Sequence, residues 1–380
     1  MMTLVIYSEI LNIHQVCVAD ELYGILKDHF YFVELTQSGE TKGGTEDYSR
    51  RPYLVCSWKN HEEESRAMEL ARTADACVFA SIHSLRFKKE RLRLNKLSYE
   101  MGERWLDRGL VKLLSPRLLI NQWYYHTQWC RKPLYQLCCG GFAANDYYFL
   151  RSFRNKCYKW GYFTKVEELE IEKLIQIPAS GDMTILWCGR FLYWKHPELI
   201  VKLAKRLTDD GYHIKVEMYG TGEELDKIKD LRASLGLHDI VRLKGKVNNN
   251  QIIEAMRTSP LFVMTSDQME GWGAVLNEAM SNGCAVVASD KIGATPYLLK
   301  DGKNGLVFES GNMDSLYSKV KDLIDHPSLL RSLAFKAYSD MANIWSPKSA
   351  AQNLLQLTDD LLQGKESSIM DGPCSKALPI

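Results

Sequence analysis

Residues 261–288 constrain the fold of this chain more than any other stretch. Residues 261–264 and 283–288 are short apolar runs of the kind that form buried strands, and residues 274–280 between them have helical character. A glycine-bearing turn precedes the helical residues. The order strand, turn, helix, strand predicts one unit of a parallel sheet, and similar units recur along the chain. The sequence therefore predicts an α/β protein.

The turn of this unit carries groups that suit a phosphate and a sugar. Gly271 and Gly273 allow backbone N–H groups to approach a ligand at the start of a helix, where unpaired donors and the helix dipole favour an anion. Glu270 stands at the mouth of the turn, where its oxygens can bind sugar hydroxyls. Glu278 lies about two helical turns further on and is suited to bridging a ribose diol. The alternative is an ordinary strand, turn and helix with two solvated glutamates.

Residues 270–280 resemble the glutamate-pair signature of retaining glycosyltransferases of family 4, which are two-domain enzymes of the GT-B fold. The resemblance implies that Glu270 contacts the donor sugar as a catalytic group and that Glu278 holds the ribose. It also implies that backbone amides of this segment contact the sugar and the diphosphate. The donor-binding residues implied in this stretch are Gly271, Trp272, Gly273, Ala274, Val275 and Glu278.

Two cations follow the apolar run 183–188, in the loop after a predicted strand. The pair Gly189-Arg190, with Lys195 five residues after the arginine, resembles a pattern of the same family. Two permanent cations in one loop favour an anion between them, and a departing nucleoside diphosphate builds negative charge that fixed cations stabilise. The alternative is two exposed surface cations. Further positions that resemble the family's nucleotide-bordering loops are Gly220, Gly222 and Lys244.

Polar residues also follow the predicted strands of the first half. His14 and Gln15 come after the first strand-like run, where an α/β sheet places its ligand-facing loops. His83 follows a later strand-like run and resembles the acceptor-side histidine of many family 4 enzymes, which implies a catalytic role. A capping or core place for His14 and a surface-loop place for His83 are the structural alternatives. Glu103 and Arg104 resemble a segment of a bacterial subgroup and are assigned to the acceptor side.

Residues 83–133 carry a local excess of positive charge, with twelve Lys and Arg against four Asp and Glu, although the whole chain has a net charge of only +1. Apolar residues interleave with the cations, which predicts amphipathic helices. Such a stretch suits the surface of an anionic membrane, and family 4 enzymes often dock in this way. A solvated helix face is the alternative. No nucleic-acid motif accompanies the charge, so we expect no nucleic acid partner.

The length of 380 residues suits two domains of ordinary size. No apolar run approaches the roughly 18 residues that span a bilayer, and the first residues lack the basic start of a signal peptide. The ten cysteines include no C-x-x-C pair, so we expect reduced thiols. These features predict a cytoplasmic protein, peripheral at most on the inner face of the cytoplasmic membrane.

Together these patterns and the resemblance predict a GT-B fold, with two doubly wound, Rossmann-like α/β domains facing across a cleft. We expect residues 1–165 to form the acceptor-side domain and residues 166–346 the nucleotide-sugar-binding domain. Residues 347–363 are expected to form a helix that crosses back to the first domain, and residues 364–380 a disordered tail.

The resemblance implies a retaining hexosyltransferase that moves a sugar from a UDP- or GDP-linked donor to a hydroxyl of a glycan or lipid-linked acceptor, in bacterial surface polysaccharide biosynthesis. No cofactor or metal is expected, because no Asp-x-Asp motif follows a strand and the two cations can replace a divalent ion. The alternatives are a nucleotide-sugar epimerase of similar fold, a non-catalytic glycosyltransferase partner subunit and a membrane-surface scaffold. The paired cations and glutamates argue against the first two, and a scaffold leaves the second half unexplained.

Overall fold

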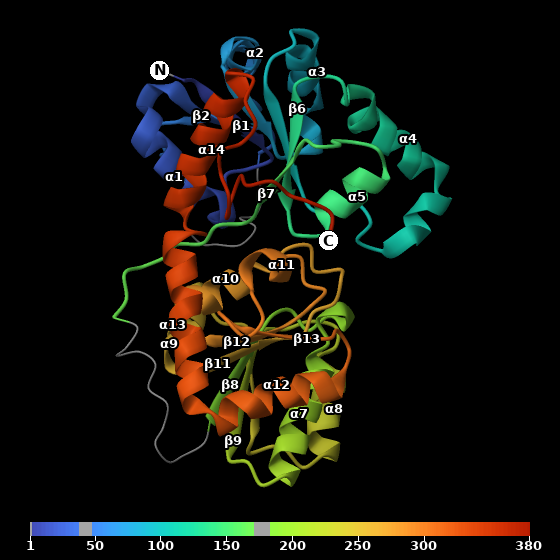
Figure 1. The fold of residues 1–380 in the computed structure, drawn as a ribbon, viewed down its shortest axis with the longest axis vertical. Coiled ribbons are helices and arrows are strands. Elements are labelled where there is room, and N and C mark those ends of the chain that lie inside the picture. Colours follow the sequence, from blue (N-terminus) through green and yellow to red (C-terminus); the bar gives the residue numbers. More distant parts are fainter. Residues whose placement is uncertain (1, 38–47, 171–182) are drawn as a thin grey trace. The chain divides into compact units, whose positions relative to one another are not determined.

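The computed structural model describes residues 2–37, 48–170 and 183–380 (Figure 1). Two compact units make up the chain. The first unit is Met1–Thr164 together with Trp345–Ile380, and the second unit is Lys165–Ile344. The boundaries expected at 165/166 and 346/347 lie within two residues of this division.

The first unit is built on a seven-stranded parallel sheet in the order β3-β2-β1-β4-β5-β6-β7. The strands are short apolar runs, as their sequences predict, and most of their residues are buried. Their bounds are β1 Leu4–Ser8, β2 Phe30–Glu34, β3 Leu54–Cys56, β4 Ala76–Phe79, β5 Ser98–Gly102, β6 Leu134–Cys139 and β7 Cys157–Trp160.

Helices connect and cover these strands. Side chains of Asn12, Asn60 and Ser115 cap the starts of α1, α2 and α4. The final helix, α14, packs against α1 (Figure 1), and α2 packs against α3. The helices are α1 Ile13–Leu26, α2 His61–Thr73, α3 Leu85–Arg93, α4 Pro116–Tyr125, α5 Ala143–Phe149 and α14 Pro347–Leu362, with the short 3-10 turns η1 Lys27–His29, η2 Ile82–Ser84, η3 Gly109–Leu114 and η4 Thr127–Trp129.

The expectation of a disordered tail is wrong for residues 364–380. The tail runs beside β7: the backbone N–H of Lys159 donates to Ser375 O at 2.8 Å, and that of Cys374 donates to Lys159 O at 2.7 Å. The side chain of Cys374 is fully buried. Because β7 is the edge strand of its sheet, its outer backbone groups need partners, and the tail supplies them. The polar composition of the tail hid these few anchoring residues.

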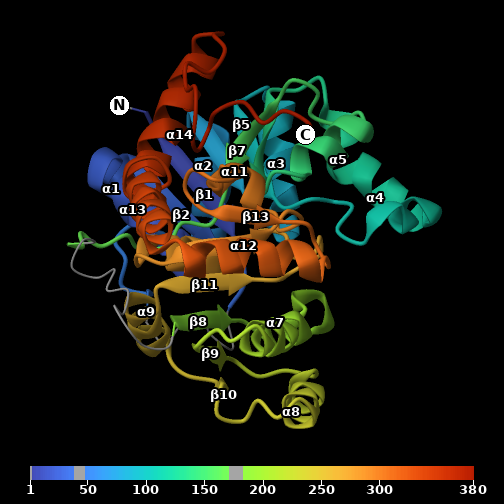
Figure 2. The ribbon, with the colours of Figure 1, turned by 60° about the horizontal axis from the view of Figure 1, so that its bottom comes forward.

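The second unit is built on a six-stranded parallel sheet in the order β10-β9-β8-β11-β12-β13. Helices α7 and α8 lie along one side of this sheet and α9 along the other (Figure 2). The strands are β8 Met183–Cys188, β9 Ile214–Tyr219, β10 Val241–Gly245, β11 Leu261–Met264, β12 Ala285–Ser289 and β13 Leu306–Phe308. The helices are η5 Tyr193–Lys195, α7 Pro197–Asp209, α8 Leu225–Ser234, α9 Asn249–Thr258, α10 Ala274–Ser281, α11 Thr295–Leu298, α12 Met313–Asp325 and α13 Pro327–Asn343.

Strand order reverses once in each sheet, between β1 and β4 in the first unit and between β8 and β11 in the second. At such a reversal the connections leave toward opposite faces and open a crevice at the carboxyl ends of the two strands. Ligand-binding groups are therefore expected in the loops after β1, β4, β8 and β11. The candidate residues predicted from the sequence lie largely in these loops.

Candidate functional site

Hydrogen bonds join the loop after β11 to strand β8 and to the loop that follows β8. The hydroxyl of Thr265 donates to the carbonyl of Lys195 at 2.6 Å, and the indole of Trp187 donates to Thr265 Oγ1 at 3.1 Å. The backbone N–H of Asp267 donates to the carbonyl of Trp194 at 2.9 Å. The loop that carries Lys195 is therefore fixed against the loop that leads to Glu270.

Lys195 and Glu270 form an ion pair at this junction, from Nζ to Oε2. Their side chains are only 12% and 17% exposed. The hydroxyl of Ser266 donates to the same Glu270 oxygen at 3.1 Å. Two residues 75 positions apart, both predicted as catalytic, are thus brought into contact. A partly buried charge pair of this kind is held strongly in place, because water screens it little.

Arg190 is not joined to this pair. Its side chain is exposed, and among the described residues no hydrogen bond or ion pair involves its guanidinium group. The two cations predicted to share an anion are therefore arranged differently: Lys195 is neutralised by a carboxylate, whereas Arg190 is available at the edge of the loop. Gly189, between Arg190 and the end of β8, donates its N–H to Tyr219 O at 3.0 Å.

Glu278 lies on α10, near the carboxyl end of β8. Burial raises the pKa of its carboxyl group to about 7. Burial also raises the pKa of Cys188 to about 12, and the nearby Glu278 carboxylate adds to this effect. Among the described residues, no hydrogen bond or ion pair satisfies the Glu278 carboxylate. A largely buried carboxylate without a donor among the described residues is costly to the fold and suits a ligand that brings hydroxyl donors.

Glycines let backbone segments approach one another around the site. A Cβ atom on Gly220, whose φ is +130°, would lie 1.9 Å from the carbonyl oxygen of Gly189. A Cβ on Gly293 would lie 1.7 Å from the carbonyl oxygen of Gly271. Neither position accepts a larger residue without a backbone shift. Gly222 follows in the same loop as Gly220, and Gly293 was not among the predicted site residues.

The start of α10 presents backbone groups rather than side chains. Trp272 is buried, and its indole N–H donates to Asn277 Oδ1 at 2.9 Å, so its side chain belongs to the core. Gly273 is the N-cap residue with φ +94°, and Ala274 and Val275 open the helix. The backbone roles that the resemblance implies for these positions stay predictions.

Lys244 lies away from the central loops, on the edge strand β10. Its ammonium group contacts Glu217 on the neighbouring strand β9 at 3.2 Å and lies 5.7 Å from the centre of the Tyr219 ring. The structure does not bring Lys244 into contact with Lys195, Glu270 or Glu278.

His196 and Asp267 are polar residues of the central loops that the sequence analysis did not single out. The imidazole Nε2 of His196 lies 3.3 Å from Asp267 Oδ2, and its Nδ1 lies 3.0 Å from Glu198 Oε1. The only signal in the sequence was that His196 directly follows Lys195 and precedes Pro197. Nothing in that order predicts a partner 71 residues away.

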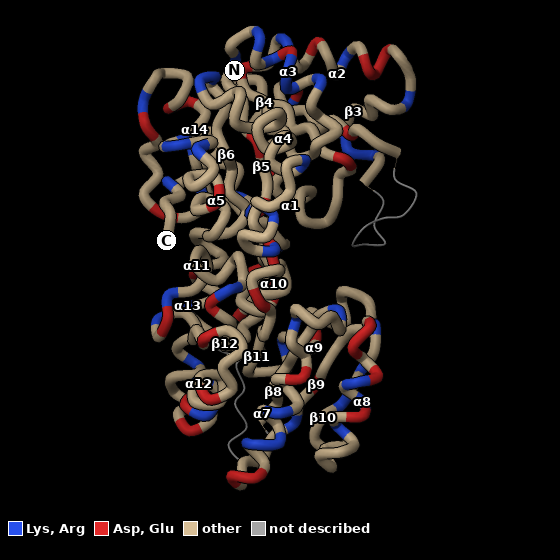
Figure 3. The backbone as a smooth tube through the Cα atoms, turned by 90° about the vertical axis from the view of Figure 1, so that its right-hand side faces the viewer, with Lys and Arg blue, Asp and Glu red and all other residues tan. Residues whose placement is uncertain are grey.

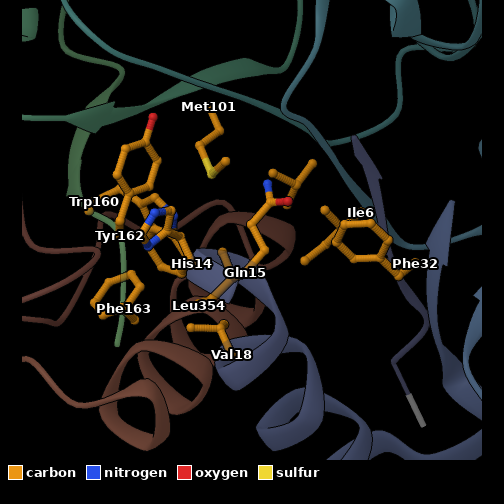
Figure 4. A pocket seen from close by; sticks show the side chains of 12 residues that line it. Ile6, His14, Gln15, Val18, Phe32, Met101, Trp160, Tyr162, Phe163 and Leu354 are labelled. Carbon is orange, nitrogen blue, oxygen red and sulfur yellow. The ribbon is translucent and has the colours of Figure 1, made fainter. Parts of the chain in front are cut away.

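In the first unit, His14 and Gln15 open α1 after β1. The His14 ring stacks on Tyr162 with ring centres 5.6 Å apart, and burial lowers the pKa of His14. Gln15 Oε1 accepts hydrogen bonds from Ser8 Oγ and Asn12 Nδ2, both at 3.2 Å. Figure 4 shows His14, Gln15 and Tyr162 around a small, mainly apolar cavity of about 20 Å³, which is the space of about one water molecule. His14 Nδ1 is buried there without a hydrogen-bond partner among the described residues.

Glu103 lies close to this group, whereas Arg104 is tied elsewhere. The hydroxyl of Tyr162 donates to Glu103 Oε1 at 2.9 Å. The Arg104 guanidinium donates to both oxygens of the buried Asp146, at 3.2 and 3.3 Å. Glu103 and His14 therefore both contact Tyr162, whereas the guanidinium group of Arg104 is paired with a carboxylate inside the fold.

His83 lies in the loop after β4, on η2, and its side chain is exposed. Its Nε2 lies 3.8 Å from Glu9 Oε1, in the loop after β1. Glu9 after β1 and His83 after β4 thus place a carboxylate and a histidine at the reversal of strand order. No contact joins His83 to His14 among the described residues.

Not every cation of the basic stretch 83–133 lies on the surface. Arg91 is fully buried, and its guanidinium donates to four backbone carbonyls. Lys88 is also buried and contacts Glu100 at 2.9 Å. In Figure 3, α3 carries both blue and red segments, whereas α4 is mostly tan. Several of the counted cations are therefore structural groups, which a count along the sequence does not reveal.

The described residues contain neither a helix long and apolar enough to cross a membrane nor a cluster of three or more His, Cys, Asp or Glu that suits a metal ion.

The two sheets with their central reversals define a protein of the GT-B fold. The crystal structure of Anabaena Alr3699/HepE in complex with UDP matches 95% of this chain and 100% of its own, with a TM-score of 0.68 and 14% identity. A glycosyltransferase from Rickettsia africae ESF-5 matches 96% of this chain and 99% of its own, with a TM-score of 0.69 and 14% identity.

Sequence comparisons place the family resemblance in the second unit. Residues 170–340 match the model of the family "Glycosyl transferases group 1". The poly(glycerol-phosphate) alpha-glucosyltransferase of Bacillus subtilis (strain 168) is 32% identical over 180 residues, which are 47% of this chain and 26% of that protein. The poly(ribitol-phosphate) alpha-N-acetylglucosaminyltransferase of Staphylococcus aureus (strain COL) is 29% identical over 170 residues, 44% of this chain and 34% of that protein. The chain spans less than half the length of either relative.

Proposed function

We propose that this chain is a retaining glycosyltransferase of family 4, which moves a sugar from a nucleotide-sugar donor to a hydroxyl of a glycan or lipid-linked acceptor in surface polysaccharide biosynthesis. The observation that carries the proposal is the contact between Lys195 and Glu270 at the central reversal of the second sheet. On the helix that follows, Glu278 has no hydrogen-bond or ion-pair partner among the described residues. This site lies within the segment that matches the family model.

The donor lies along the central loops of the second unit in this proposal. Glu278 accepts from the ribose hydroxyls, and backbone N–H groups at the start of α10 meet the diphosphate. Arg190, whose cation is exposed, and Lys195 neutralise the diphosphate, while Glu270 orients the sugar. The donor is UDP- or GDP-linked and needs no metal ion, because two cations already serve the leaving group.

Transfer proceeds on one face of the sugar. The acceptor oxygen attacks the anomeric carbon as the bond from that carbon to the diphosphate oxygen breaks. The acceptor proton passes to the departing diphosphate, which carries away the electron pair of the broken bond. Because both bonds lie on the same face, the anomeric configuration is retained. The names of the two curated relatives specify alpha linkages, which fits retention from an α-linked donor.

The acceptor side is assigned to the first unit, to the group around His14, Tyr162 and Glu103. Burial lowers the pKa of His14, so its imidazole is neutral near pH 7 and can accept from or donate to an acceptor hydroxyl. The phenol of Tyr162 bridges His14 and Glu103 by a stacking contact and a hydrogen bond. His83 has a place beside Glu9 on the same sheet edge and is retained as a catalytic candidate.

The first test is thermal unfolding of the purified protein with UDP, GDP and their sugar conjugates. Binding to the folded state alone stabilises it by RT ln(1 + [L]/Kd), about 2.7 kcal/mol at a hundredfold excess over Kd. Lys195→Met should abolish the shift. Lys319→Met is the matched control, because Lys319 forms an ion pair with Asp301 on the same unit at 2.9 Å. No shift with any nucleotide would remove the basis of the proposal.

For a lipid-linked acceptor, we propose that the segment 108–124 contacts the membrane. In this part of the basic stretch the structure exposes apolar side chains: Leu114 is 81% and Trp123 56% exposed. The exposed Arg108 precedes them in the sequence, and the exposed Arg117 lies between them. Apolar groups with an interfacial tryptophan and nearby cations suit insertion among anionic headgroups. The exposed large apolar residues are Leu110, Val111, Leu114, Leu119, Ile120, Trp123 and Tyr124.

Co-sedimentation with lipid vesicles tests this contact. The protein should bind vesicles of phosphatidylglycerol and phosphatidylcholine more strongly than vesicles of phosphatidylcholine alone. The double variant Ile120→Ser with Trp123→Ser should lose most of the binding. Phe335→Ser is the control, because Phe335 is a comparably exposed apolar residue of the second unit. Equal binding by the double variant would contradict the proposed contact.

A further inference from the structure

His196 holds a backbone conformation that a histidine rarely adopts. Its φ and ψ are 46° and 51°, in the left-handed region. In the described part of the second unit it is the one residue other than glycine with positive φ. It also precedes Pro197, which disfavours helical conformations of the preceding residue. Glycine would adopt this conformation without the steric penalty, so the imidazole is present despite an unfavourable backbone.

The imidazole contacts a carboxylate at each nitrogen. Nδ1 lies 3.0 Å from Glu198 Oε1, and Nε2 lies 3.3 Å from Asp267 Oδ2. A carboxylate only accepts hydrogen bonds, and a neutral imidazole has a single N–H. Both contacts are therefore hydrogen bonds only when both ring nitrogens carry a proton. The geometry fits an imidazolium cation between two anions.

The surroundings support the charged form. The hydrogen bond to Glu198 raises the pKa of His196, the contact with Asp267 adds to this, and partial burial opposes it. Burial works to raise the pKa of Glu198, but the interactions with His196, with its own backbone N–H and with Lys202 together outweigh it and the pKa is lowered. Lys202, further along α7, is the other charged group that acts on Glu198. Below its raised pKa, His196 thus joins Glu198 and Asp267, and above it one contact is lost.

These contacts link the two loops that carry the proposed catalytic groups. His196 directly follows Lys195, and Asp267 lies three residues before Glu270. The second oxygen of Asp267 accepts from the backbone N–H of Met269 at 2.8 Å, which fixes the carboxylate on its own loop. A bond from His196 to Asp267 therefore adds a charged contact to the hydrogen bonds that already hold the loop of Lys195 against the loop of Glu270.

We propose that the imidazolium of His196 is a positioning group, which clamps the loop after β8 to the loop after β11 and holds Lys195 and Glu270 in register for the donor. The inference rests on the proposed function. It adds to that function a protonation requirement at a residue that itself touches neither sugar nor phosphate. The clamp is present at low pH and weakens as the pH rises through the raised pKa of His196.

The test compares the wild type with His196→Gly, which keeps the left-handed backbone and removes the imidazole. The Kd of UDP and GDP is measured by calorimetry from pH 5.5 to 8.5, with kcat and KM for the sugar conjugate that binds. The variant should bind the nucleotide about tenfold more weakly at pH 6, since a charge-assisted contact is lost and the cation is misplaced. By pH 8.5 the wild type and the variant should bind the nucleotide with the same Kd. Glu278 titrates in both proteins, so its effect cancels in the ratio of their Kd values.

Two further variants make the outcome specific. Asp267→Asn keeps the acceptor for Met269 but removes the charge, so it should lose the pH-dependent part of the advantage. His326→Asn is the matched control, because His326 contacts Asp322 at 2.9 Å on the same unit, between α12 and α13. A ratio of wild-type to His196→Gly affinity that is constant with pH would overturn the clamp, as would equal affinities at pH 6.

Histidine NMR separates failure of the clamp from failure of the proposed function. The nitrogen signals that disappear in His196→Gly identify the imidazole and report its protonation without a nucleotide. Two protonated nitrogens at pH 6 support the imidazolium, and a neutral ring at that pH overturns it. If neither UDP nor GDP binds the wild type, the glycosyltransferase assignment fails, and the NMR titration still decides whether His196 bridges the two carboxylates.

Discussion

Glu278 should make this protein less stable as the pH rises toward neutrality. Burial raises the pKa of its carboxyl group from the ordinary 4.5 to about 7. The folded state therefore binds this proton more tightly than the unfolded state does. Stability is greatest below pH 4.5, falls between pH 4.5 and 7, and no longer changes above pH 7 on account of this group. Since each pKa unit corresponds to about 1.4 kcal/mol, the ionised carboxylate lowers the free energy of unfolding by about 3 kcal/mol.

Glu278→Gln tests this value, because the amide has nearly the same shape and stays neutral at every pH. The free energy of unfolding is measured by denaturant titration from pH 4.5 to 8.5. The two proteins should have similar stability near pH 4.5, and the variant should be more stable by about 3 kcal/mol above pH 7. Glu254→Gln, at an exposed position on α9, is the control and should follow the wild type. A constant difference between Glu278→Gln and the wild type across this range would refute the argument.

The same variant should lose nucleotide binding above pH 7. There the wild-type carboxylate is ionised and, in the proposed complex, accepts from the ribose hydroxyls, whereas the glutamine amide presents one acceptor oxygen and no charge. A more stable but weaker-binding variant is the pattern expected when a functional group is buried at a cost to the fold. Calorimetry with UDP and GDP at pH 8 measures the loss. Unchanged affinity would show that Glu278 does not hold the ribose.

Three further substitutions follow from the contacts of individual residues. Gly293→Ala places a methyl group 1.7 Å from the carbonyl oxygen of Gly271, so denaturant titration should show a loss of about 1 to 3 kcal/mol, with weakened nucleotide binding. Glu270→Gln releases Lys195 from its ion pair. Calorimetry should show tighter binding of a nucleoside diphosphate, while the rate of sugar transfer falls. Weaker binding of the diphosphate would contradict the assignment of Lys195 to the phosphates. Arg91→Met leaves four carbonyls without their donor. In a denaturant titration it should destabilise the first unit by about 3 kcal/mol. An unchanged unfolding midpoint would refute this prediction.

The sequence predicted the parallel sheets well because buried parallel strands are short apolar runs bounded by turn residues. Residues 261–264 and 285–289 are β11 and β12, and the glycine-bearing turn between them lies where it was expected. The candidate residues Lys195 and Glu270 followed two different strands in the sequence. That these strands are neighbours at the reversal of strand order is a property of the whole sheet. Local pattern therefore located the groups, whereas their contact depended on topology.

Side-chain partners were beyond the reach of the sequence. In the sequence, Arg91 looked like one of many surface cations. In the structure its guanidinium group is buried and donates to backbone carbonyls from separate segments, which come together only in the fold. We expected Arg104 on the acceptor side of the site, but its guanidinium group instead donates to the carboxylate of Asp146, which lies 42 residues away. His196 has a left-handed backbone, which is uncommon for any residue other than glycine, and its partner Asp267 lies 71 residues away. In each case a partner far away in the sequence decides whether the charged side chain is part of the fold or available to a ligand.

Most of the charge at the candidate site is compensated within the protein. Lys195 is paired with Glu270, and His196 lies between two carboxylates. A diphosphate that contacts Lys195 therefore takes a cation away from Glu270, and this carboxylate must then find other donors. Sugar hydroxyls can supply them, whereas a nucleotide without its sugar cannot. Under the proposed function, the pair should favour a complete nucleotide sugar over the free diphosphate, and it should couple recognition of the sugar to recognition of the leaving group.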